Sequence, residues 1–291
     1  MPNISRFDRQ IEFEKINVSV LILTRNEKVN IGACLDHLRW SDDVVVFDSL
    51  STDETEEIAK KYGVRWIQRK FTNWSEHQNW AMENIPFKHE WVYYTDADER
   101  VPCELAEEIL SKTSSASNDK VAYQVRRRDY YGESWIRRST NYPLWFVRLF
   151  RPQAIRWSRK VNPVPTISGP IGNLENDFIH FPLSKGIGEW VDRHNSYSNF
   201  EAMELIKSLD SGDFRLGDLF SSDRVAQRHA MKKLSFRLPF RPVLRFFFLY
   251  FVKGGILDGT MGLRYCIMKA FYQYMIDIKV EEKLAKGGEA S

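Results

Sequence analysis

The sequence predicts an α/β protein whose first part is a parallel, doubly wound sheet. Short apolar runs at residues 18–23, 44–47 and 91–94 have the length and composition of buried strands, and stretches of helical spacing separate them. Strands that alternate with helices form parallel sheets covered on both faces. Each of the three runs ends in polar residues, and ligands of such sheets bind at the carboxyl ends of the strands, where strand order reverses. We therefore expect one shared binding site at these ends.

The elements follow one another in a regular order. The expected strands cover residues 18–23, 44–47, 64–67 and 91–94. The expected helices cover residues 29–38, the stretch between Asp53 and Gly63, and residues 75–84. The first helix has Ile31, Leu35 and Leu38 at helical spacing. Asp53 is typical of a capping carboxylate at the start of the second helix, and Gly63 is typical of a helix end.

Two carboxylates, Asp96 and Asp98, follow the fourth strand directly and stand two residues apart. At a strand end this spacing points both side chains the same way. Mg²⁺ and Mn²⁺ prefer oxygen ligands and complete their shells with substrate phosphates and water. The pair is therefore typical of a Mg²⁺ or Mn²⁺ site that holds a diphosphate, and the alternative is a solvated turn.

Four motifs together resemble a known family. They are residues 19–27, ending in Thr24-Arg25-Asn26-Glu27, residues 46–55 around Asp48-Ser49, Gln78-Asn79, and Asp96-Ala97-Asp98-Glu99. Their order and spacing resemble the nucleotide-sugar half of inverting family 2 glycosyltransferases. The resemblance implies the GT-A fold, a Rossmann-like mixed sheet flanked by helices, here followed by a helical carboxyl-terminal region.

Further motifs resemble one branch of that family, the one that contains lipopolysaccharide-core β-glucosyltransferases. They are Trp135-Ile136, Arg148-Leu149-Phe150, residues 169–180, and Leu257-Asp258-Gly259. Acceptors in this branch are commonly lipid-linked, so the resemblance also implies a saccharide acceptor on lipid.

Several residues are expected to bind the donor. Thr24, Asn26 and Glu27 end the first strand and are expected to line the nucleotide, unless they only form a strand-to-helix turn. Asp48 is expected to accept from the N–H of the base, as its family counterpart does for uracil. By resemblance, Gln78 and Asn79 lie near the donor, although paired amides on a helix are as often surface residues.

The remaining expected roles concern the diphosphate and its cation. The resemblance places Asp96 near the ribose or the sugar, makes Asp98 the metal ligand, and makes His180 the histidine that closes the metal site. A structural histidine is the alternative for His180. Arg148 is expected to contact phosphate through its fork of donors, or else to be a strand-edge arginine.

The sequence departs from the branch where a general base is expected. Relatives tend to carry His-Glu ahead of residues 169–180, but this chain has Asn162-Pro163, and neither residue can accept a proton. An inverting transfer needs a base within reach of the acceptor hydroxyl. Glu175, Asp177 and Glu133 are the candidates, by neighbourhood alone.

Composition narrows the setting. The chain has 291 residues, is 43% hydrophobic and carries a net charge of +3, so it can bury a full core and its charge does not call for nucleic acid. Cys34, Cys103 and Cys266 are scattered, and the charged amino terminus lacks the apolar core of a signal peptide. We therefore expect reduced thiols and a cytoplasmic location.

Basic residues gather in two regions. The first includes Arg126, Arg127 and Arg128 and is expected to form a solvated face. The second, residues 232–253, mixes Lys and Arg with Phe, Leu and Tyr. Its apolar run, residues 243–252, is too short to span a bilayer and is interrupted by Arg245. The region suits the headgroup level of an anionic membrane, with a packed helix as the alternative.

The expected organisation is a GT-A domain over residues 1–182 and a mostly helical, membrane-contacting region over residues 183–291. The expected reaction is an inverting, metal-dependent transfer of a sugar from a nucleoside diphosphate, UDP above all, to a lipid-linked saccharide or lipopolysaccharide core. One alternative is a sugar nucleotidyltransferase, disfavoured because the first strand lacks a glycine-rich phosphate loop. The other is a non-catalytic member that binds nucleotide sugar or acts as a scaffold, which Asn162-Pro163 favours.

Overall fold

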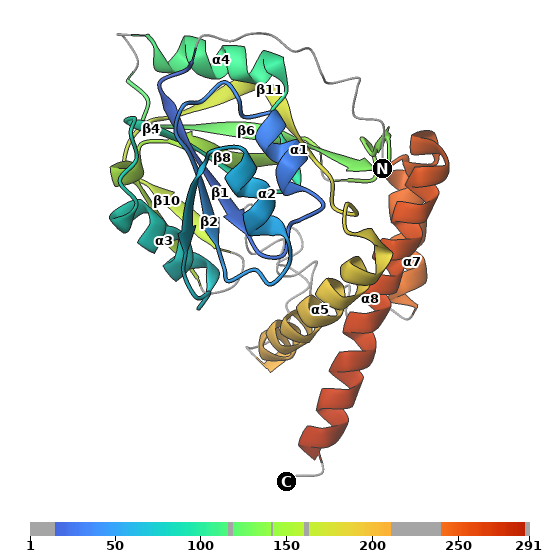
Figure 1. Cartoon of the computed structure of the whole chain (residues 1–291). Coiled ribbons are helices and arrows are strands. Elements are labelled where there is room, and N and C mark those ends of the chain that lie inside the picture. The colour runs from blue at the N-terminus through green and yellow to red at the C-terminus, as the bar shows by residue number, and fades with distance from the viewer. Residues whose placement is uncertain (1–14, 116–118, 141, 160–162, 211–239, 289–291) are drawn as a thin grey trace. The chain divides into compact units, whose positions relative to one another are not determined.

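The computed structural model describes residues 15–115, 119–140, 142–159, 163–210 and 240–288 (Figure 1). The chain divides into two compact units. Unit 1 takes in the described residues of Met1–Trp135 and Asn141–Ser184, and unit 2 takes in Ile136–Thr140 and the described residues of Lys185–Ser291.

Unit 1 is built on a mixed sheet that, among the described residues, has nine strands. Eight of them follow the order β3-β2-β1-β4-β8-β6-β11-β5, and β7 pairs with β6. The strands are β1 (Val18–Thr24), β2 (Val44–Asp48), β3 (Arg65–Gln68), β4 (Trp91–Asp96), β5 (Glu99–Arg100), β6 (Ala122–Tyr131), β7 (Ser134–Trp135), β8 (Trp145–Phe150) and β11 (Ile171–His180). The strands β1 to β4 run parallel, whereas β8 is antiparallel to both β4 and β6.

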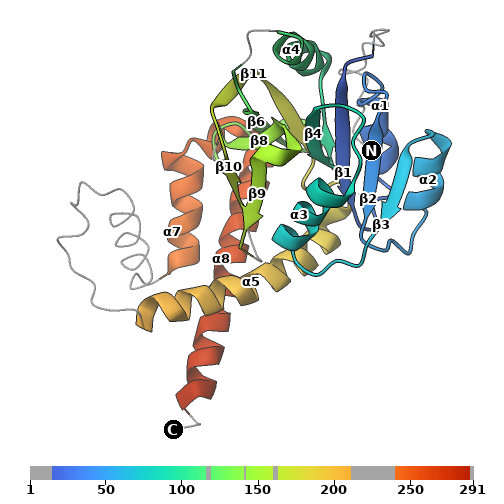
Figure 2. The ribbon, with the colours of Figure 1, turned by 90° about the vertical axis from the view of Figure 1, so that its left-hand side faces the viewer.

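Helices cover both faces of this sheet (Figures 1 and 2). The α-helices in the described part of unit 1 are α1 (Ile31–Asp36), α2 (Thr55–Lys61), α3 (Trp74–Asn84) and α4 (Cys103–Thr113). Side chains of α1, α2 and α4 share one buried cluster with Val20 and Ile22 of β1. The α3 helix and the β9–β10 pair (Ile155–Ser158 and Val164–Ile167) share the other cluster with Leu21 and Leu23. Alternate β1 residues therefore face opposite cores, as a doubly wound sheet requires.

The expected mixed α/β fold is confirmed, with element boundaries shifted by at most two residues. The first helix begins at Ile31 and ends at Asp36, inside the expected 29–38. Glu54 holds the N-cap position of α2, and Asp53, one residue earlier, accepts a hydrogen bond from the backbone N–H of Thr55 at 3.1 Å. The expected capping carboxylate thus contacts the first turn from just outside the helix. Strand order reverses between β1 and β4, because β2 and β3 continue on one side of β1 and β4 lies on the other.

Unit 2 is helical, as expected for the carboxyl-terminal region. Its elements are α5 (Gly186–Asp210), α7 (Arg241–Phe247), the π-helical turn η4 (Phe248–Val252), the 3₁₀ turn η5 (Gly255–Asp258) and α8 (Gly259–Gly288). Figure 2 shows α7 beside α8, and α5 crossing α8. Asp258 accepts hydrogen bonds from the backbone N–H groups of Arg138 and Ser139 at 3.0 and 3.1 Å, which fastens the Ile136–Thr140 segment to this unit.

Candidate active site

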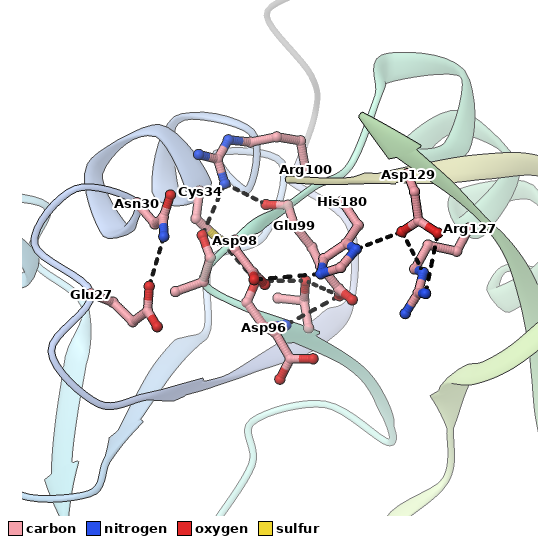
Figure 3. Close-up of polar contacts among 12 residues, drawn as sticks. Glu27, Asn30, Cys34, Asp96, Asp98, Glu99, Arg100, Arg127, Asp129 and His180 are labelled. Carbon is pink, nitrogen blue, oxygen red and sulfur yellow. Dashed lines mark hydrogen bonds and ion pairs between the residues drawn. The ribbon is translucent and has the colours of Figure 1, made fainter. Parts of the chain in front are cut away.

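Strand pairing brings Asp98 and His180 together at the carboxyl end of β4. The two-residue strand β5 pairs with the end of β11, with Glu99 opposite His180. The backbone N–H of Phe181 also donates to the carbonyl of Asp98 at 2.9 Å. As a result, Asp98 Oδ2 lies 3.4 Å from His180 Nε2, and each side chain keeps 17% of its surface exposed (Figure 3). Two residues 82 positions apart in the chain thus face each other at the predicted site.

Asp129 contacts Nδ1 of His180. The sequence alone did not predict a role for this residue. Parallel pairing of β6 with β11 sets Asp129 opposite His180. His180 Nδ1 lies 2.6 Å from Asp129 Oδ1, and Arg127 Nε lies 2.9 Å from the same oxygen. Burial disfavours the imidazolium, but Asp98 and Asp129 together raise the pKa of His180 to about 9. The row Arg127–Asp129–His180–Asp98 therefore fixes the imidazole with Nε2 toward Asp98 (Figure 3).

Asp98 and His180 fit as two ligands of one divalent cation whose other ligands come from substrate and water. Adjacent ligands of a six-coordinate ion at about 2.1 Å stand about 3 Å apart, close to the separation of Asp98 Oδ2 and His180 Nε2. A carboxylate on the far side of a metal-binding imidazole is the usual arrangement in metalloproteins. Among the described residues no group of three or more His, Cys, Asp or Glu side chains gathers as a metal site. The protein would therefore supply two ligands and leave the other positions to substrate and water.

Asp96 belongs to a buried ionic cluster beneath the site. Arg148 donates to Asp96 Oδ2 at 3.2 Å and to Glu99 Oε1 at a shorter distance, and only 5% of Arg148 is exposed. Although burial works against it, the Glu99 and Asp96 carboxylates raise the pKa of Arg148. Glu99 also accepts from the hydroxyl of Thr95 at 3.1 Å. Arg148 therefore holds the two acids in place, and its expected phosphate contact stays a prediction.

Asp96 keeps a free approach from solvent on its other side. Its side chain is 39% exposed, and its Oδ1 accepts from the hydroxyl of Tyr94 at 3.3 Å. Ring faces of Tyr94 and Phe178 lie about the Arg148 guanidinium, at 4.8 and 5.0 Å from the ring centroids. Asp96 is thus oriented by buried groups while its carboxylate stays accessible, as a ribose or sugar ligand needs.

The ends of β1 and β2 form one hydrogen-bonded loop pair. Asp48 is buried and accepts from Thr24 Oγ1 at 3.0 Å, from the Ser51 backbone N–H at 2.8 Å and from Gln68 Nε2 at 3.1 Å. Asn26 has a left-handed backbone, with φ of 54°, and accepts at Oδ1 from the Thr52 N–H at 2.8 Å. These bonds give Asp48 and Asn26 a role in shaping the loops. The expected contact of Asp48 with a base stays a prediction.

Glu27, in the loop after β1, is held by two hydrogen bonds. It accepts from Asn30 Nδ2 at 2.7 Å, and its backbone N–H donates to Thr55 Oγ1 at 2.8 Å. Figure 3 places Glu27 and Asn30 on the same side of the site as Asp98. The first strand end therefore does contribute a carboxylate to this edge of the sheet.

The two amides of α3 differ in what they contact. Asn79 uses both side-chain atoms on the backbone of Trp157, with Nδ2 2.9 Å from its carbonyl and Oδ1 2.8 Å from its N–H. Gln78 donates from Nε2 to the Tyr94 hydroxyl at 3.1 Å. Among the described residues, no partner lies within hydrogen-bond distance of the buried Gln78 Oε1. Asn79 therefore fastens α3 to β9, and Gln78 is the one of the pair with an acceptor left for a ligand.

The geometry counts against both leading candidates for the general base. Asp177 accepts from Arg126 Nε and Arg128 Nε at 2.6 Å each and from the Tyr142 hydroxyl at 2.9 Å, and its side chain is fully buried. It precedes His180 by three residues on β11, so it points to the opposite face of the sheet. Its two carboxylate oxygens are already occupied by the two guanidinium groups and the Tyr142 hydroxyl.

Glu175 is remote from the cation site. It is exposed, and it lies five strand residues before His180, roughly 15 Å along β11. Its backbone N–H donates to Glu108 Oε1 at 2.7 Å. Glu133 is exposed in the turn between β6 and β7, and Asn162 lies outside the described residues.

The same contacts correct the expectation for the first basic region. Arg126, Arg127 and Arg128 are not a solvated face, because their side chains keep only 28, 24 and 37% of their surface exposed. Arg126 and Arg128 pair with Asp177, and Arg127 pairs with Asp129. The arginine run therefore organises the interior of unit 1 next to the candidate site.

The polar loops of unit 1 lie at the β1–β4 switch point, the place where open α/β sheets bind their ligands. The sequence profile described as "Glycosyl transferase family 2" matches residues 19–172, which is more than half of the chain. The chain belongs to this family and is a glycosyltransferase with the GT-A fold.

One of two similar relatives has a name that agrees with the expected branch. The chain is 26% identical over 285 residues to the lipopolysaccharide core biosynthesis glycosyltransferase LpsC of Rhizobium meliloti, covering 93% of this chain and 94% of the relative. It is also 26% identical over 289 residues to an uncharacterized glycosyltransferase of Rickettsia conorii, covering 92% and 91%. The resemblance to the lipopolysaccharide-core branch is therefore confirmed.

Two solved structures have a partly similar chain trace. TarS 1-349 of S. aureus in complex with UDP has a TM-score of 0.47 at 14% identity, over 94% of this chain and 92% of that chain. The mannosyltransferase PcManGT from Pyrobaculum calidifontis in complex with GDP-Man and Mn²⁺ has a TM-score of 0.44 at 15% identity, over 95% and 92%.

Proposed function

We propose that this glycosyltransferase moves one sugar, with inversion, from a nucleoside diphosphate to a lipid-linked saccharide or to lipopolysaccharide core, and that the transfer depends on Mg²⁺ or Mn²⁺. The observation that carries the proposal is the Asp98–His180 pair at the end of β4, with Asp129 behind the imidazole. The LpsC relative supports the class of acceptor. UDP is the proposed nucleotide.

Asp98 and His180 are the residues that would hold the cation. When bound, the cation stabilises the charge that develops on the diphosphate as the sugar–phosphate bond breaks. His180 offers Nε2 only in its neutral form, so its proton must leave before it can act as a ligand. Asp129 keeps the ring turned for this contact through Nδ1. An imidazole ligand favours Mn²⁺ over Mg²⁺, since Mg²⁺ sites are built from oxygen.

The neighbouring residues would orient the donor. Asp96, with its exposed carboxylate, is proposed to bind hydroxyl groups of the ribose or the sugar. Thr24, Asn26, Glu27 and Asp48 shape the loops in which the nucleotide is proposed to lie, with Asp48 the proposed partner of the base. The unpartnered Gln78 Oε1 supports a donor contact for this residue. Such fixed polar groups lower the barrier by holding the reacting atoms at the right distance.

The proposed setting is the inner face of the cell membrane, with the enzyme in the cytoplasm and bound at the surface. We propose residues 1–182 as the catalytic domain and residues 183–291 as the part that contacts membrane and supports the acceptor. Among the described residues, no single helix has the length and apolarity to cross a bilayer. Two consecutive helical segments, Arg241–Val252 and Gly255–Ala285, meet the length and apolarity test when they are taken together, and the chain bends by 72° between them.

A non-catalytic function is the second candidate, because Asn162-Pro163 stands where relatives tend to carry His-Glu, and the two leading substitutes do not suit the role: Asp177 is fully buried and Glu175 is remote. The deciding experiment is transfer assayed over a panel of nucleoside diphosphate sugars and lipid-linked acceptors, next to UDP binding with Mn²⁺. Binding with transfer supports the proposed reaction. Binding without any transfer supports the non-catalytic candidate, and the absence of both contradicts the proposal.

A further inference from the structure

The segment from α7 to η5 in unit 2 leaves a continuous series of large apolar side chains exposed. Phe240, Val252 and Leu257 keep 79, 74 and 68% of their surface exposed. The series is Phe240, Val243, Leu244, Phe247, Phe248, Phe251, Val252, Ile256 and Leu257. We call it the apolar ridge. A patch of this kind on a folded protein marks a surface that contacts a partner or a membrane.

The apolar ridge belongs to a well-packed element, so its exposure is not a failure to fold. Arg241 pairs with Asp277 of α8 at 2.5 Å, and Leu249 is buried beneath the ridge. The ring of Phe247 stacks on that of Phe251 with centroids 5.6 Å apart. Contacts below and between the aromatic rings therefore hold the outward side chains in place, which reduces the entropy cost of docking.

Close glycine packing fixes the bend that follows the ridge. A Cβ on Gly262 would stand 2.2 Å from the carbonyl oxygen of Gly255, and a Cβ on Gly255 would stand 2.8 Å from Cys266 Sγ. Gly254 and Gly259 have left-handed φ values of 77° and 66°. The chain therefore turns sharply between η4 and α8. Figure 2 shows α7, before this turn, beside α8, which follows it.

The charge along the ridge is of one sign. From Arg224 to Leu257 the sequence has no Asp or Glu, and Arg245 and Lys253 are exposed within the ridge. An isologous dimer through this face would bring together two patches that both carry only positive charge, because each copy uses the same patch. An anionic bilayer instead offers acyl chains to the aromatic rings and phosphates to the cations.

We propose that α7, η4 and η5 form a wedge that enters one leaflet of an anionic bilayer and leaves it on the same side. The apolar ridge would reach the border of the acyl chains, and Arg245 and Lys253 would stay at the level of the phosphates. The bend of 72° suits a re-entrant wedge and not a straight span. This inference deepens the membrane contact of the proposed function, and its test does not depend on catalysis.

The experiment measures binding of the full chain to sedimented vesicles of phosphatidylcholine with phosphatidylglycerol, in low salt and in 1 M NaCl, where the Debye length is ~3 Å. The unmodified protein should stay bound in both. The double variant Phe247→Ser with Phe251→Ser should lower partitioning about tenfold or more. The matched controls Ile187→Ser and Leu284→Ser remove equally exposed apolar side chains of α5 and α8, at 56 and 52%, and should bind like the parent.

A second readout reports depth. Val252→Cys, in a Cys103→Ser background and labelled with an environment-sensitive dye, should shift its emission to the blue on vesicles, whereas Leu284→Cys should not. Release of the unmodified protein by 1 M NaCl, or an unshifted Val252 label, would overturn the wedge in favour of surface adsorption. A dimer by light scattering that the Phe247/Phe251 variant abolishes, with no vesicle binding, would assign the ridge to a second copy. UDP binding with Mn²⁺, measured without lipid, tests the proposed function separately.

Discussion

Replacing Asp177 by asparagine should destabilise unit 1 and leave catalysis nearly intact, the reverse of what a general base would show. The fully buried carboxylate accepts charge-assisted bonds from Arg126 and Arg128 at 2.6 Å each. Such bonds are worth about 1.5–3 kcal/mol each, and the asparagine carbonyl can keep one, so the loss is roughly 3 kcal/mol. For a unit of this size that lowers Tm by roughly 6–12 °C.

Thermal unfolding and turnover, measured on the same preparations, decide the role of Asp177. Glu175→Gln is the matched control, because its exposed side chain should change stability by no more than about 0.5 kcal/mol. An unchanged Tm for Asp177→Asn, together with turnover lower by about two to four orders of magnitude, would refute the structural role and restore Asp177 as the base.

Three further predictions concern other parts of the chain. Burial and Arg69 lower the pKa of His77 to about 4, below its ordinary 6.5, so the unfolded chain binds more protons in this range. Stability should therefore fall as pH drops from 6.5 to 4, by ~3 kcal/mol from this residue. In the His77→Gln variant the free energy of unfolding should change less between pH 6.5 and 4 than in the parent. An equal pH dependence in the two proteins would contradict the assignment. Gly262→Ala should destabilise unit 2 by about 3 kcal/mol in urea unfolding, while Gly188→Ala, which meets nothing within 4 Å, should not; equal midpoints would count against the packing. Asp129→Asn should weaken Mn²⁺ affinity by roughly 10–100-fold, followed by calorimetry, and parental affinity would show that the imidazole needs no support.

Local patterns explain most of what the sequence predicts correctly. The strands at residues 18–23, 44–47 and 91–94 are buried on both faces, so each shows as a continuous apolar run. Asp96 and Asp98 follow such a run directly, which makes their place in the fold predictable. The helix beginning at Trp74 follows Asn73, whose side chain accepts from the Glu76 N–H, a local cap that any sequence window contains.

The features that the sequence does not predict depend on pairing between distant strands. Asp129 meets His180 only because β6 pairs with β11, and no short window contains both. Asp177 seemed a candidate base from its distance in sequence to His180, but an odd separation along a strand turns the two side chains to opposite faces. The prediction of a solvated face for Arg126 and Arg128 was also wrong because of strand pairing. Their counter-charge, Asp177, lies on another strand.

The central claim is that Asp98 and His180 hold a cation that binds the donor diphosphate. Calorimetric titration of UDP into the unmodified protein, with and without Mn²⁺, against Asp98→Asn tests it most directly. We expect tight binding only when Mn²⁺ is present, and a loss of at least about tenfold in the variant, whose fold stays intact because Asp98 follows the strand and is not part of the core. Equal UDP affinities for the two proteins, or parental binding that ignores Mn²⁺, would contradict the claim.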